Sequence, residues 1–143
     1  MMGSRWPLDG LLRFRRLEQD QAEADLAEAN HRLRSSEHAV NRARNNLAGY
    51  GDSAVTVEQL RAIAAARSTG AAMVQELNAV VKLDEADARA KAFEAERARR
   101  ATKSLDKLHD RHLEAEHAAD LRDEQAAIDE IAARNAGARK GNR

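Results

Sequence analysis

Residues 22–47 read AEADLAEANHRLRSSEHAVNRARNNL, and a ladder with a seven-residue repeat runs through them. A large apolar residue recurs at every seventh position, at Leu26, Leu33, Val40 and Leu47. A small residue stands four positions before each of these, at Ala22, Ala29, Ser36 and Ala43. Such alternating spacing is typical of a coiled coil, and small side chains let two helix backbones approach closely. We therefore expect a rod that packs against another helix.

The composition suits long helices better than a globular core. Charged residues make up 34% of the 143 residues and aromatic residues 3%, which leaves little bulk for a three-dimensional core. The 24 basic and 24 acidic residues cancel, so we expect no nucleic-acid partner, because such proteins usually carry a basic excess. The absence of cysteine excludes disulfides and thiolate metal sites. Without a signal-like or membrane-spanning apolar run, we expect a soluble, cytoplasmic protein.

Glycine and proline divide the chain into two predicted helices. Pro7 lies where a helix can start, and the segment Gly49-Tyr50-Gly51-Asp52-Ser53 interrupts the pattern. Thr56 with Gln59 has the spacing of a capping box. We expect one domain over 1–143, with a helix at about 8–49, a turn at 50–56, a helix at about 57–136 and a basic tail at 137–143. A short loop between long helices favours an all-α fold, a long antiparallel two-helix coiled-coil hairpin.

The second helix carries its own apolar seam, at Leu60, Ile63, Arg67, Gly70, Val74, Leu77 and Val81. This spacing passes through Gly70, so we expect one continuous helix, with a separate short helix at 57–69 as the alternative. If the turn centres near residue 53, Leu47 faces the region of Leu60, Leu33 that of Val74 and Leu26 that of Val81. The first helix then ends beside residue 98.

Apolar residues continue beyond that point with drifting spacing, so we expect the strict heptad to be lost there. They are Leu105, Leu108, Leu113, Leu121, Ile128 and Ile131. A lone helix of this kind is only marginally stable in water. Either this overhang has a partner, or it frays or pairs elsewhere.

Few residues suggest chemistry. His109, His112 and Glu116 lie near one helical face and are ligand types that bind zinc. A solvated helix also carries histidines by chance and supports a metal site poorly, so we expect none. Ser35, Ser36 and His38 have no arrangement that activates a nucleophile. A two-helix rod offers no cleft, so we expect no enzyme activity, cofactor or small-molecule substrate.

Two segments resemble the FliJ family of flagellar export proteins. One is RFRRLEQDQA at 13–22, which continues to LAEA at 26–29, and the other is DEQAAIDEIAAR at 123–134. The resemblance implies a non-enzymatic, chaperone-like stalk similar to the γ subunit of F-type rotary ATPases. Its implied partners are a hexameric export ATPase, the cytoplasmic domain of the export gate and export chaperones. It would lie at most peripherally on the cytoplasmic face of the inner membrane.

The resemblance also implies two partner-binding surfaces. The terminal half of the rod would enter the ATPase ring, through Arg13, Arg15, Arg16, Gln125, Asp129, Glu130 and Arg134. The gate would contact the early second helix, at Leu60, Ile63, Arg67 and Met73, although this region is alanine-rich and lacks the family's aromatic residues. Two alternatives remain: a homo-oligomeric coiled-coil scaffold and an injectisome stalk protein of the same shape.

Overall fold

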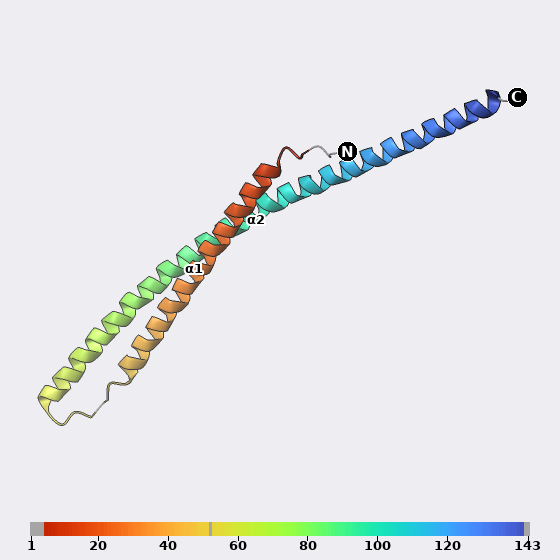
Figure 1. The fold of residues 1–143 in the computed structure, drawn as a ribbon. Helices are drawn as coiled ribbons and strands as arrows, with labels where there is room; N and C mark the ends of the chain where they lie inside the picture. Colours follow the sequence, from red (N-terminus) through yellow and green to blue (C-terminus); the bar gives the residue numbers. More distant parts are fainter. Residues whose placement is uncertain (1–4, 52, 142–143) are drawn as a thin grey trace. The chain divides into compact units, whose positions relative to one another are not determined.

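The computed structural model describes residues 5–51 and 53–141, which form two helices joined by a loop (Figure 1). Helix α1 spans Asp9–Ala48 and helix α2 spans Val57–Gly141, so the predicted all-α helical hairpin is confirmed. α2 continues to Gly141 instead of ending near residue 136, and most of the expected basic tail is therefore helical. Residues 142–143 lie outside the described residues. Within the described ranges, no helix has an apolar stretch long enough to cross a membrane.

Local hydrogen bonds explain where both helices begin. The Asp9 N–H donates to the Trp6 carbonyl at 3.1 Å, just after the proline that pre-sets the backbone for a helix. At the start of α2, the Gln59 N–H donates to Thr56 Oγ1 at 3.1 Å. Gln59 Oε1 in return accepts from the Thr56 N–H at 3.3 Å. These reciprocal bonds satisfy backbone donors that a helix leaves unpaired, and they confirm the predicted capping box.

The chain packs as two compact units, and in the unit Leu17–Arg99 the two helices run antiparallel (Figure 1). The buried residues of this unit are mostly small: Ala29, Ser36, Val40, Ala43, Ala88 and Ala95. Leu26, Leu33 and Leu47 are half-buried beside them. The second unit joins residues up to Arg16 with α2 from Arg100 onward, and it buries Leu12, Thr102 and Leu105. The ladder at 22–47 thus forms the internal seam of the hairpin.

The pairing register differs from the expected one. A Cβ added to Gly70 would lie 3.0 Å from Leu47 Cδ1, so Leu47 faces Gly70 and not Leu60. Leu26 and Leu33 line one cavity with α2 residues 85, 88, 89 and 92, and so do not face Val81 and Val74. The expected register is wrong by roughly three helical turns. It paired large residues with large ones, whereas closely packed helices set large side chains against small ones.

The seam positions of α2 keep a strict seven-residue repeat well beyond residue 98, contrary to the expectation. One series is Val74, Val81, Ala88, Ala95, Thr102, His109 and Glu116, and the other is Gly70, Leu77, Asp84, Lys91, Ala98, Leu105 and His112. Every one of these residues is buried or half-buried. Polar residues occupy several of these positions, so a search for apolar residues alone does not detect the repeat. Gly70 lies within the continuous helix, as expected.

Candidate partner-binding surfaces

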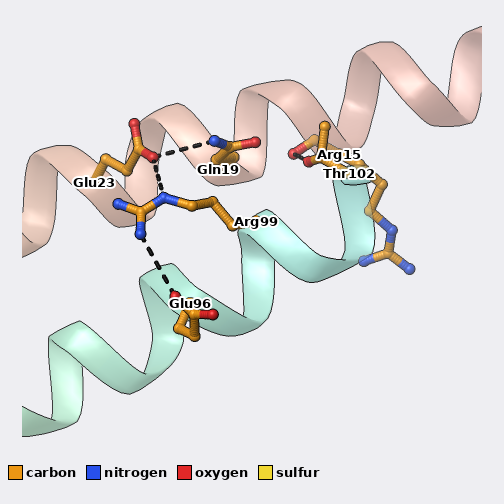
Figure 2. Close-up of polar contacts among 6 residues, drawn as sticks. All are labelled: Arg15, Gln19, Glu23, Glu96, Arg99 and Thr102. Atoms are coloured by element: carbon orange, nitrogen blue, oxygen red, sulfur yellow. Dashed lines mark hydrogen bonds and ion pairs between the residues drawn. The ribbon is translucent and has the colours of Figure 1, made fainter. Parts of the chain in front are cut away.

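The N-terminal arginines bind to neighbouring residues of their own unit. Arg13 Nη2 lies 2.7 Å from Asp9 Oδ2 one turn earlier, and this hydrogen bond lowers the pKa of Asp9 below its ordinary value of 3.8. Arg16 Nη2 lies 3.0 Å from Asp106 Oδ1 on α2. The Arg15 carbonyl accepts a hydrogen bond from Thr102 Oγ1 at 3.2 Å (Figure 2). The contacts of Arg15 and Arg16 join the first turns of α1 to α2.

The histidines considered as metal ligands lie against an aromatic ring. The centre of the Trp6 ring is 4.9 Å from that of His109 and 6.4 Å from that of His112. His112 Nε2 lies 3.1 Å from Glu116 Oε1, within ion-pair distance but without the alignment of a hydrogen bond. Over residues 5–51 and 53–141, no three acidic, histidine or cysteine side chains are arranged to hold a metal ion. His109 and His112 occupy seam positions, where they pack against the segment that precedes α1.

The last part of α2 is exposed along its whole described length, from His117 to Gly141. Gln125 Nε2 donates to Asp129 Oδ1 at 2.9 Å, and Arg134 Nη2 lies 2.8 Å from Glu130 Oε1, both one turn apart. Large apolar side chains accompany these polar pairs: Leu121 is 52% exposed, Ile128 58% and Ile131 57%.

The structure does not bring the two halves of the candidate ring-binding set together. The arginines of α1 meet α2 near Asp106, and roughly 28 Å of helix separates that residue from Gln125. The exposed apolar residues also do not continue the hairpin seam. Leu121 and Ile128 each follow a position of the seam repeat by five residues, which turns them about 140° around the helix. This stripe therefore faces away from the side that α1 would cover.

The gate candidates lie in the first turns of α2, next to the loop. Leu60 is 58% exposed and Met73 is 53% exposed, while Ile63 is half-buried. Arg67 Nη2 donates to the Tyr50 carbonyl at 3.3 Å and so holds the loop against the helix. Leu60 and Met73 therefore offer apolar surface, whereas Arg67 has a structural contact within the hairpin.

A polar cluster within the hairpin was missed in the sequence. Arg99 Nε lies 2.9 Å from Glu23 Oε1, and Gln19 Nε2 donates to the same oxygen at 3.1 Å (Figure 2). The bond from Gln19, followed by that from Arg99, lowers the pKa of Glu23 below its ordinary value of 4.5. Gln19 stands seven residues before Leu26. The seven-residue repeat of the ladder, continued by one step to this polar residue, is therefore the sequence signal that locates the cluster.

The chain matches a protein-family model. The family model described as Flagellar FliJ protein matches residues 4–141, a segment that includes every candidate residue named above. No curated protein and no solved structure matches the chain significantly.

Proposed function

Because this chain belongs to the flagellar FliJ protein family, and is thus a component of flagellar protein export, we propose that it acts as a stalk of the export ATPase. In this role it is a structural component and not an enzyme. The exposed end of α2 enters the hexameric ATPase ring. The hairpin end, near the loop, contacts the cytoplasmic domain of the export gate.

The observation that carries this proposal is the exposed part of α2. From His117 onward the helix has charged and apolar side chains on its surface and no buried residue up to Gly141. Leu121, Ile128 and Ile131 are more than half exposed. An apolar stripe on a helix normally faces a partner, because burying it removes apolar area from water. We assign Gln125, Asp129, Glu130 and Arg134 to the ring contact together with these three residues.

The N-terminal arginines then support the stalk. Arg13 and Arg16 already pair with Asp9 and Asp106, while their side chains remain 64% and 57% exposed. Arg16 holds the beginning of α1 on α2. Both arginine side chains still present positive charge to a ring that approaches from this side. Arg15 completes the same basic surface.

The mechanism follows from symmetry. A single copy of the chain has no rotational symmetry, so inside a ring of six equal subunits it contacts each subunit differently. Those differences bias which subunits close on ATP, and the bias moves as hydrolysis proceeds. The gate contact, through Leu60, Ile63, Arg67 and Met73, transmits the state of the ring to the gate. Export chaperones bind to the same chain, which works in the cytoplasm, peripheral to the inner membrane at most.

Two matched double variants test the two assignments. Leu121→Glu with Ile128→Glu is expected to abolish co-purification with the cognate export ATPase and its promotion of hexamer formation, and to leave gate binding intact. Leu60→Glu with Met73→Glu is expected to do the reverse. Each variant controls for the other, since both place two acidic residues on α2. If the wild-type chain neither binds the ATPase nor changes its assembly, the stalk proposal is wrong.

A further inference from the structure

A second exposed apolar surface lies on the outer side of α2, within the unit Leu17–Arg99. We call it the outer seam and define it by Val80, Leu83 and Phe93. Leu83 is 71% exposed, more than any other leucine that the structure describes, Phe93 is 65% exposed, more than Phe14, and Val80 is 43% exposed. Side chains of this size in water on a rigid helix mark a surface that another element covers.

The outer seam follows its own seven-residue pattern. Leu83 and Phe93 fall on the two alternating core positions of a heptad that also contains Ala79, Ala86 and Ala90. All five residues are exposed, so α1 covers none of them. The next core positions outward are Glu76 and Arg97. Each would repel its own copy in a symmetric pair, so the surface ends there after about two heptads.

The charges beside the outer seam specify what covers it. Lys82 and Arg89 flank it on one side, and Asp87 and Glu94 flank it on the other. In two parallel, in-register helices, a residue on the first side meets the residue five positions later on its neighbour. Lys82 then meets Asp87 of a second copy, and Arg89 meets Glu94. Symmetry doubles both attractions, whereas antiparallel pairing sets Lys82 against Arg89 or Lys82.

These charged groups are available for such pairing. Among the described residues, Lys82 and Arg89 have no ion pair. Asp87 lies 3.7 Å from Arg32, and Glu94 lies 3.8 Å from Lys91, so both carboxylates have only loose partners in the hairpin. Exposed pairs at these distances contribute little to stability and are easily exchanged.

We propose that the outer seam is a self-association surface, on which two copies of this chain pair through α2, parallel and in register. Leu83 packs on Leu83 of the second copy, and Phe93 packs on Phe93. The helices are already folded, so pairing does not bear the cost of forming them. The surface is short and its ion pairs are exposed, so the dimer is weak and salt-sensitive.

Sedimentation velocity on the full chain at low ionic strength tests the surface. The mean mass should rise from one copy towards two as concentration increases from micromolar to millimolar. Leu83→Glu with Phe93→Glu should weaken this association at least roughly tenfold. Leu17→Glu is the matched control, because Leu17 is 67% exposed on α1, and it should leave the association unchanged. A chain that stays monomeric, or a dimer that the double variant does not weaken, overturns the proposal.

A charge exchange tests the orientation. Lys82→Glu with Arg89→Glu makes one chain, and Asp87→Lys with Glu94→Lys makes another. Each should fail to pair with itself, and an equal mixture should pair at least as well as the wild type. Ala86→Cys gives a second readout in this cysteine-free chain, since only parallel copies bring the two cysteines together. Crosslinking of Ala86→Cys solely with Leu83→Cys indicates antiparallel pairing and contradicts the proposed geometry.

Discussion

At the scale of single residues, Gly70 is the position where the absence of a side chain on α2 allows α1 to pack closely. A Cβ there would meet Leu47 Cδ1 at 3.0 Å and Tyr50 Cε2 at 3.8 Å. Glycine inside a helix costs about 1 kcal/mol relative to alanine, so the sequence alone presents Gly70 as a weakness. The contact with Leu47 gives it a second role, because the missing side chain admits the last large residue of the ladder.

A double-mutant cycle separates the low helix propensity of Gly70 from the space that it leaves for Leu47. Gly70→Ala alone should change the free energy of unfolding by less than the helix propensity suggests, because the new methyl group crowds Leu47. In a Leu47→Ala background the same substitution should stabilise the hairpin by about 1 kcal/mol. Urea unfolding followed by circular dichroism measures both values. Equal effects in the two backgrounds would show that Leu47 does not restrict this site.

Two carboxylates make the stability of the hairpin decrease at acidic pH. The folded pKa values of Asp9 and Glu23 lie below their ordinary values of 3.8 and 4.5, because each carboxylate accepts hydrogen bonds. A lowered pKa in the folded state stabilises the fold above the unfolded value, and this contribution is lost as pH falls through the folded pKa. The melting temperature should therefore fall between about pH 5 and pH 3. Glu23→Gln should make that decline shallower, and a decline of equal slope would count against the Glu23 contacts.

At the scale of the helices, the small residues of the seam set how closely α1 and α2 approach. Ala29 is 1% exposed, whereas Ala27, half a turn away, is exposed. Ala29→Leu should destabilise the hairpin by about 1–3 kcal/mol, because the added atoms force the helices apart. Ala27→Leu adds the same atoms in water and should stay within about 0.5 kcal/mol of the wild type. Thermal melts of the two variants test this, and similar losses in both would mean that Ala29 does not lie in a tight seam.

The helices also show how far the sequence predicts this fold. The ladder from Leu26 to Leu47, the break at Gly49 and the capping box at Thr56 locate both helices, because these signals are local. The register was predicted wrongly, since it depends on which residues of two helices interdigitate. Gly70 opposite Leu47 is visible only once both helices are placed.

At the scale of the whole molecule, the candidate surfaces were predicted unevenly for the same reason. Ile128 stands out in the sequence as an apolar position beyond the end of the predicted pairing. Leu60, in contrast, was expected to face Leu47 in the seam, and it is 58% exposed instead. The contacts of Arg16 with Asp106 and of Trp6 with His109 join residues that are about ninety or more positions apart in the sequence. No local sequence pattern predicts such contacts. The outer seam was missed because the heptad positions between Leu83 and Phe93 are alanines. Alanine is common on every face of a helix, so it does not mark a packing surface in the sequence.

The central claim is that α2 beyond Glu116 acts on the export ATPase. The most direct measurement is the rate of ATP hydrolysis by the cognate ATPase hexamer, with the full chain and with a chain truncated after Glu116. Circular dichroism melts confirm that the hairpin seam remains folded, because every seam residue lies before the truncation. We predict that the full chain raises the rate and that the truncated chain does not. Equal stimulation by both chains would contradict the account.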